Sequence, residues 1–286
     1  MDEPIKGKST SGEVWRRLKK NKIAVGSMIV LVIIFLIAIF APFLAPHPYE
    51  ETNTKRTLEG PSRDFPLGTD RLGRCTLSRI IYGSQQSLQM GIFAVTGSTI
   101  IGLCLGSIAG YYGGVVDTLL MRFLDVFQGI PMFLLTVTLA AVMGPSLRNA
   151  IVAIGISMIP GSARLMRASI LTVREMEYVE AAKSIDAGDG RIILRHIVPN
   201  AIAPVIVSYT MGMGMAVLSG AGLSFIGLGV QPPIPEWGAM ISEGRNFMRA
   251  QPQLALYPGI CVMITVLAFN MLGDGLRDAL DPRLKT

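Results

Sequence analysis

Long stretches without a charged residue constrain this chain more than any other feature of its sequence. A helix needs about 20 largely apolar residues to cross a hydrocarbon core of about 30 Å. Stretches of that length without Asp, Glu, Lys or Arg run over residues 23–45, 80–116, 126–147, 196–235 and 250–273. A chain with so many of them is expected to fold in lipid, as an all-α membrane protein.

A sixth, shorter stretch extends the pattern. Residues 149–163 are uncharged, and the long side chain of Arg164 can carry its charge to the interface. The composition agrees, because 16% of the residues are charged and soluble domains carry roughly 25%. We therefore predict six transmembrane helices, near residues 23–45, 85–109, 119–143, 149–165, 201–229 and 255–276.

The basic residues indicate how the chain is oriented. Most of the 26 lysines and arginines fall in cytosolic segments if both termini are cytosolic, which is the arrangement that the positive-inside rule favours. The net charge of +6 therefore follows membrane topology and does not indicate a nucleic-acid partner. The first apolar stretch is longer than the 7–15 residues of a signal-peptide core, and further spans follow it, so we expect it to remain as an anchor.

These spans divide the chain into segments. Residues 1–22 form a cytosolic amphipathic head, in which Trp15 and its basic neighbours are expected at the anionic surface of the membrane. The first helix follows at residues 23–45, and an external loop at 46–84. A five-helix core is predicted at 85–276, with a large cytosolic loop inside it at 166–200. A cytosolic tail is predicted at 277–286.

Two groups of residues indicate how the helices pack. Gly102, Gly106 and Gly110 recur on one helical face, and small residues let helices approach closely in lipid. A second group interleaves methionine with glycine in the fifth predicted span: Met211, Gly212, Met213 and Met215. We expect these methionines to fill the core, and the alternative is that their flexible side chains line a pathway for cargo.

The cytosolic loop has an unusual pattern for a connection between membrane helices. Residues 169–182 favour a helix, residues 186–190 are rich in Asp and Gly and break it, and helical character resumes from Arg191 before Pro199 marks the return to the membrane. A helix, a turn and a second helix form a knob that can sit in a cleft of a soluble partner and pass on a rigid-body motion. The alternative is an amphipathic loop that only contacts water.

This loop resembles the "EAA" loop of binding-protein-dependent ABC importer permeases. That motif has Glu-Ala-Ala, a glycine six residues after the Glu and a proline nineteen residues after it. The chain matches it at Glu180, Ala181, Ala182 and Pro199, and Asp186 replaces the glycine, so we expect Gly188 to supply the turn. The resemblance implies that the loop docks the motor ATPase, through residues that include Glu180, Ala181, Ala182, Asp186, Gly188, Arg191 and Pro199.

The resemblance extends over most of the chain. Segments 66–74, 77–83, 224–233, 235–238 and 273–282 are similar to the "C"-type permeases of dipeptide and oligopeptide importers and of related nickel importers. Cys75 stands where that group usually has an aspartate. The resemblance implies a type I importer permease fold in a bacterial or archaeal cytoplasmic membrane, with external segments facing a substrate-binding protein through Asp70, Arg74, Glu236 and Trp237.

The same resemblance implies the partners and the division of chemistry. They are a second, unlike permease, two ATPase subunits and the external binding protein, with the lipid bilayer around them. ATP and Mg²⁺ then belong to the ATPases, and this chain binds no cofactor or metal and catalyses no reaction. Di- or oligopeptides are the first choice of cargo, and glutathione or a nickel chelate is the alternative.

Two other classes of function make different predictions. A self-sufficient secondary transporter needs ionisable residues midway along its spans or an internal repeat, and the sequence has neither signal. A membrane enzyme needs paired acids, a metal cluster or an activated nucleophile. His47 and His196 fall on opposite sides of the predicted membrane, and the cysteines Cys75, Cys104 and Cys261 lack metal-binding spacing.

Overall fold

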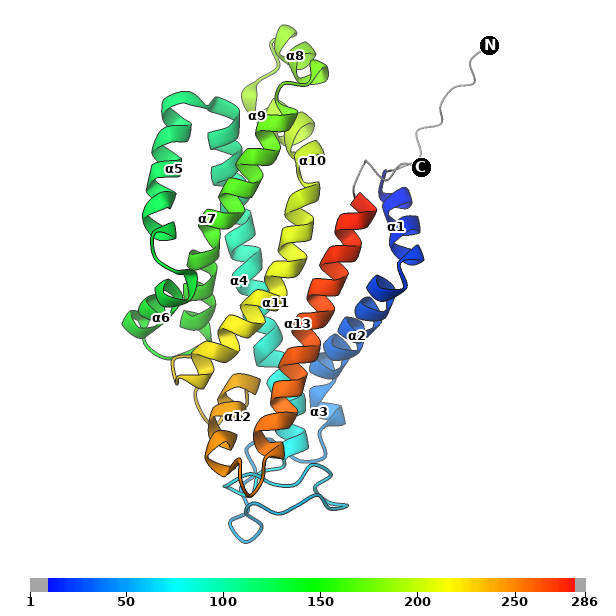
Figure 1. Ribbon diagram of the computed structural model, residues 1–286, viewed down its shortest axis with the longest axis vertical. Helices are drawn as coiled ribbons and strands as arrows, with labels where there is room; N and C mark the ends of the chain where they lie inside the picture. The colour runs from blue at the N-terminus through cyan, green and yellow to red at the C-terminus, as the bar shows by residue number, and fades with distance from the viewer. Residues whose placement is uncertain (1–9, 281–286) are drawn as a thin grey trace.

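The computed structural model describes residues 10–280 and is a tall bundle of helices (Figure 1). Residues 10–280 contain no β-strand, which confirms the all-α prediction. The long helices are α2 (Lys22–Ile39), α4 (Thr76–Tyr112), α7 (Leu147–Val173), α11 (Ala203–Phe225) and α13 (Gln253–Leu280). The shorter ones are α1 (Thr10–Lys20), α3 (Ala41–Leu44), α5 (Gly114–Gln128), α6 (Met132–Met143), α8 (Glu177–Ser184), α9 (Asp189–Arg191), α10 (Val198–Ala201) and α12 (Trp237–Gly244).

Five helices, α2, α4, α7, α11 and α13, are each long and apolar enough to cross a membrane. They correspond to five of the predicted spans, although the helices begin and end at other residues than predicted. The external loop predicted at 46–84 is shorter, because α4 begins already at Thr76. The helix predicted to end at residue 165 continues to Val173, so the predicted cytosolic loop at 166–200 loses its first turns to α7.

The third predicted span, 119–143, is wrong as a continuous helix. The chain forms α5 and α6 there, and the two helices are bent by 81° at a short break. Pro131 lies in the break and precedes α6 directly. Proline lacks a backbone N–H and disfavours the helical conformation of the residue before it, so the helix ends at this point.

Helices α4 and α7 approach closely along the predicted glycine face. A Cβ atom built on Gly102 would lie 2.5 Å from the Cβ of Ser162, and one on Gly106 would lie 2.4 Å from the carbonyl oxygen of Ala163. Gly110 continues the contact one turn further on. The structure therefore confirms that these glycines serve helix packing, and α4 and α7 form the centre of the bundle.

The methionines of α11 have three different surroundings. Met213 is half-buried and packs against two clusters of the core, and Met211 covers Gly273 of α13. Met215 is 52% exposed and points away from the core. Gly212 lies against α4, where a Cβ atom would meet Val95. Core filling therefore explains Met211 and Met213, and a pathway lined by the four residues stays a prediction.

The two ends of the bundle differ. Helix α8, helix α1 and the last turns of α13 lie at one end, and α12 with the loop between α3 and α4 lies at the other (Figure 1). Both ends of the described chain thus lie at the end that carries the loop resembling the ATPase-docking motif. Residues 1–9 of the predicted head and 281–286 of the predicted tail lie outside the described residues.

The glycine contact between α4 and α7 predicts a difference between two conservative substitutions in α4. Gly106→Ala should lower the free energy of unfolding by about 1–3 kcal/mol, because the new methyl group meets the backbone of α7. Thermal unfolding of the purified chain in detergent measures the effect. Gly97→Ala is the matched control, since nothing lies within 4 Å of its Cβ position, and it should gain about 0.5–1 kcal/mol from helix propensity. Equal unfolding temperatures would contradict this packing.

Candidate functional site

The cytosolic loop of the sequence analysis forms a small folded unit at the end of α7. The chain leaves α7 at Val173 and starts α8 at Glu177, so the helix predicted over 169–182 is broken in its middle. Within α8, Val179 and Ala182 are buried, while Glu180 and Ala181 are exposed. This three-residue spacing places the buried pair on one face of the helix.

The return path covers that buried face. After α9 the chain continues in a π-helix over Ile192–Ile197 and then in α10, which contains Pro199. Ile192 and Ile197 are fully buried and join Val179 in one hydrophobic cluster with the end of α7. The predicted helix–turn–helix shape is thus present, and its own core holds α8 against the membrane helices.

The turn of this unit depends on Asp186. Its φ angle is 56°, in the left-handed region, whereas Gly188 has a φ of −60° and an extended backbone. The expectation that Gly188 supplies the turn is therefore wrong. Asp186 adopts the conformation itself, because a short polar side chain tolerates the left-handed region better than other non-glycine residues.

The unit exposes apolar as well as charged side chains. Ile185 is 79% exposed and Leu194 is 72% exposed, and Met176 and Tyr178 are also exposed. We call these four side chains the α8 patch. The same unit exposes charged side chains: Glu177, Glu180, Lys183 and Arg191. Exposed large apolar side chains of this kind are found at protein–protein contacts.

Polar contacts join this unit to the ends of α4 and α7. The Tyr111 hydroxyl donates a hydrogen bond of 2.7 Å to Asp189, and the Lys183 ammonium lies 5.7 Å from the centre of the Tyr111 ring. The Arg174 guanidinium donates a 2.9 Å hydrogen bond to the carbonyl oxygen of Gly110. These contacts tie the unit to the closely packed α4–α7 pair.

A polar cleft of about 430 Å³ lies between α5 and α7. Arg167 bridges the two helices by donating two hydrogen bonds of 2.5 Å to Asp117. Arg164 of α7 pairs with Asp125 of α5 in the same way. Ionised groups in membrane proteins face water or one another, so this cleft is a polar region at the edge of the bundle.

The four residues expected to face a binding protein are buried in the chain itself. Asp70, Arg74, Glu236 and Trp237 are 8%, 3%, 0% and 2% exposed. Their side chains therefore make their contacts within this chain. Their positions show that they hold together the end of the bundle opposite α8.

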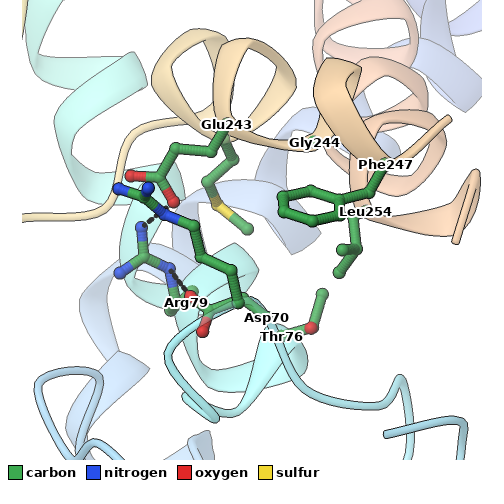
Figure 2. A pocket seen from close by; sticks show the side chains of 9 residues that line it. Asp70, Thr76, Arg79, Glu243, Gly244, Phe247 and Leu254 are labelled. Carbon is green, nitrogen blue, oxygen red and sulfur yellow. Dashed lines mark hydrogen bonds and ion pairs between the residues drawn. The ribbon is translucent and has the colours of Figure 1, made fainter. Parts of the chain in front are cut away.

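Asp70 and Arg74 belong to a buried network of charges. Asp70 accepts a hydrogen bond of 2.6 Å from Arg74 and lies 3.5 Å from Arg79, and Glu243 lies 3.0 Å from Arg74 and 3.3 Å from Arg79. Figure 2 shows Arg79 reaching from α4 toward both Asp70 and Glu243, beside a cavity of about 20 Å³. The network joins the external loop, α4 and α12, and the charges of the two acids balance those of the two arginines.

Glu236 and Trp237 place α12 in the bundle. Glu236 caps α12 by accepting a 2.9 Å hydrogen bond from the Ala239 N–H, and a second from the Ser87 hydroxyl at 2.9 Å. Burial raises the pKa of the Glu236 carboxyl. The Trp237 ring donates a 3.0 Å hydrogen bond to the carbonyl oxygen of Ile80. The segment between α11 and α13 therefore contains a helix, α12, that packs back into the bundle.

Cys75, the departure noted in the external segment, is the N-cap residue of α4. Its buried side chain makes no capping hydrogen bond. An aspartate, which the resembling permeases usually have here, favours this position because its carboxylate accepts hydrogen bonds from the first helical N–H groups. The next residue, Thr76, has a buried hydroxyl without a hydrogen-bond partner in the described part of the chain.

Sequence reasoning missed several residues of these sites. Glu243 is 164 residues from Arg79 and 169 from Arg74 in the chain, and no local pattern links them. Arg79 stands at the boundary of an uncharged stretch, which is the signal that could have drawn attention to it. The pairing of Asp117 with Arg167, 50 residues apart, likewise depends on the contact between α5 and α7.

Comparison with known proteins identifies the family. Residues 102–286 match the family described as the binding-protein-dependent transport system inner membrane component, and residues 9–61 match the N-terminal transmembrane domain of oligopeptide transport permease C. The chain belongs to this family of transport permeases, and its N-terminal segment places it with the C-type members.

Relatives cover nearly the whole chain. The dipeptide transport system permease protein DppC of Alkalihalophilus pseudofirmus is 48% identical over 274 residues, covering 96% of this chain and 90% of that protein. The glutathione transport system permease protein GsiD of Pectobacterium atrosepticum is 44% identical over 275 residues, covering 96% and 91%.

Solved structures share the fold. A chain of the MetNI methionine ABC transporter, in an inward-facing conformation, superposes with a TM-score of 0.58 at 18% identity and covers 72% of this chain and 97% of its own. A chain of an amino acid ABC transporter superposes with a TM-score of 0.55 at 17% identity and covers 69% and 92%. The bundle is therefore the fold of ABC transporter membrane subunits, and the chain is a multi-pass inner membrane component.

The left-handed turn at Asp186 predicts which substitutions the cytosolic loop tolerates. Asp186→Gly should preserve or stabilise the loop, and Asp186→Val should destabilise it by about 1–2 kcal/mol, because a β-branched residue disfavours this conformation. The rate of cleavage of the loop by a soluble protease reports the change. Gly188→Ala is the control, since its φ is ordinary and nothing lies within 4 Å. Faster cleavage of Gly188→Ala than of Asp186→Val would indicate that Gly188, and not Asp186, forms the turn.

Proposed function

We propose that this chain is the C-type permease subunit of an ATP-driven type I importer for di- or oligopeptides. The observation that carries the proposal is its 48% identity, over 96% of its length, to a dipeptide transport permease. The cargo crosses the membrane between this chain and a second, unlike permease, and this chain does no chemistry on it. ATP and Mg²⁺ are bound by two ATPase subunits.

The α8 patch is the proposed docking surface for an ATPase subunit. Its exposed apolar side chains have no partner in the described chain, and Glu180 and Lys183 are exposed on the same unit to pair with charges on the ATPase. The buried Val179, Ile192 and Ile197 beneath it make the unit stiff. An ATPase that moves on binding ATP therefore displaces α7 and α10 as a body.

The orientation follows from the same assignment. Docking of an ATPase places the α8 end in the cytosol, and with it α1 and the last turns of α13, which lie at that end (Figure 1). The loop between α3 and α4 then faces the outside, where the binding protein delivers cargo. Because Asp70, Arg74, Glu236 and Trp237 are buried, they act by holding this outer end together and not by touching the binding protein.

Glutathione is the second candidate cargo. The observation that favours it is the 44% identity to glutathione transport permeases over 96% of the chain. Glutathione is itself a tripeptide, so one pathway can carry both classes. A nickel chelate is the third candidate and has only the resemblance of the sequence motifs to support it.

Two substitutions in the docking surface should separate coupling from folding. Ile185→Asp and Glu180→Lys each leave the buried core of the loop intact, and each should weaken association with the ATPase subunits at least about tenfold, or roughly 1.4 kcal/mol. Co-purification and ATP-dependent uptake measure the effect. Lys55→Glu, an exposed charge reversal at the other end of the bundle, should retain association with the ATPase subunits. Normal coupled transport with both loop variants would exclude the α8 patch as the docking surface.

The cargo is tested by reconstitution. The chain is purified from its native membrane with the subunits that accompany it and is placed in vesicles. The binding protein is on the same side of the vesicle membrane as the substrate. ATP-dependent uptake of a labelled dipeptide, in competition with glutathione and with a nickel chelate, ranks the three candidates. If neither glutathione nor the nickel chelate reduces uptake of the dipeptide, the result supports a peptide cargo. Solute movement by this chain alone, without ATP, would instead identify a secondary transporter.

A further inference from the structure

Helix α1 is a basic, aromatic helix whose position at the membrane surface is set by the chain itself. It ends at Lys20, and the span α2 begins at Lys22 after a single residue, Asn21, which caps it. The Asn21 side chain accepts hydrogen bonds of 3.1 Å from the backbone N–H groups of Ile23 and Ala24. Because α2 enters the hydrocarbon directly after this cap, α1 must lie at the depth of the lipid headgroups.

One face of α1 packs on the bundle. Leu18 is 5% exposed and lies in a cluster with Ala24 of α2 and Ala279 of α13, and Val14 packs beside it, one helical turn earlier. Gly275 of α13 admits this contact, since a Cβ atom there would lie 3.5 Å from Leu18 and 2.3 Å from Ala24. Helix α1 is therefore attached to both the first and the last span (Figure 1).

The other face of α1 points away from the protein. Trp15 is 46% exposed, and the Lys19 ammonium lies 5.0 Å from the centre of its ring. Arg16, Lys19 and Lys20 are all exposed. An aromatic ring with an apolar body and a polar edge, surrounded by cations, is suited to the boundary between acyl chains and phosphates.

The acidic groups nearby do not neutralise this face. Glu13 is in the first turn of α1, and Asp274 and Asp278 are exposed on the neighbouring α13. None of the three forms an ion pair with Arg16, Lys19 or Lys20 within the described residues. The exposed face therefore keeps an excess of positive charge at headgroup depth.

We propose that this face of α1 binds the phosphates of anionic phospholipids, with Trp15 inserted at the level of the acyl-chain carbonyls. Juxtamembrane basic clusters gain binding energy from each Lys or Arg near an anionic surface. The bound headgroups then hold α1 in place over the contact between α2 and α13. This inference does not depend on the identity of the cargo or on the docking of an ATPase.

Tryptophan fluorescence provides a direct test, because the chain has two tryptophans and Trp237 is 2% exposed in the bundle. The purified full-length chain is reconstituted in phosphatidylcholine vesicles that contain the same fraction of a brominated lipid, either phosphatidylglycerol or phosphatidylcholine. Brominated phosphatidylglycerol should quench the emission severalfold more than brominated phosphatidylcholine, and added salt should reduce the difference because it screens the charges. Trp15→Phe identifies the share of the signal that comes from α1.

Charge reversal gives the matched comparison. In the combined variant R16E/K19E/K20E, the two brominated lipids should quench the tryptophan emission equally. The variant Lys55→Glu, at the far end of the bundle, should behave as the wild type. The unquenched emission of Trp237 reports that each variant is folded. Equal quenching of the wild type by both lipids would overturn the proposal. Protection of Trp15 from both lipids would also overturn it, because the ring would then not lie at the lipid surface.

Discussion

The close approach of α4 and α7 is the contact on which the rest of the structure depends. In lipid there is no hydrophobic force to bring helices together, so backbone packing must do so. Glycines at 102, 106 and 110 remove the side chains that would separate the two helices. The end of α7 then stands beside the end of α4, where Arg174 and Tyr111 hold the cytosolic loop.

That geometry also explains how a short loop is held in a fixed shape. A helix such as α8 has too few residues to be stable alone in water, and its stability comes from the cluster of Val179, Ile192 and Ile197 with the end of α7. Its outer face exposes apolar as well as charged side chains. The unit has its own core and is attached to the closely packed pair of α4 and α7.

The opposite end of the bundle is held by a different kind of interaction. There the loop between α3 and α4, α4 itself and α12 are joined by a network of charges, all largely or partly removed from solvent: Asp70, Arg74, Arg79 and Glu243. Removing one partner of such a network leaves an uncompensated buried charge. The motif residues of this end, which the resemblance led us to expect at a binding protein, thus serve the architecture of the end opposite α8.

The sequence by itself determined the membrane as the solvent and located the five long apolar helices, because apolar length and the absence of charge are properties of one segment at a time. It also located the glycine face and the cytosolic helix–turn–helix, both of which follow from local spacing. Tertiary structure alone decided the break between α5 and α6, the left-handed turn at Asp186, and the burial of Asp70, Arg74, Glu236 and Trp237. The reason is that a charged side chain can be buried only when an oppositely charged partner lies beside it. For Arg74 one such partner is Glu243, which is far away in the chain and which the fold brings to within about 3 Å.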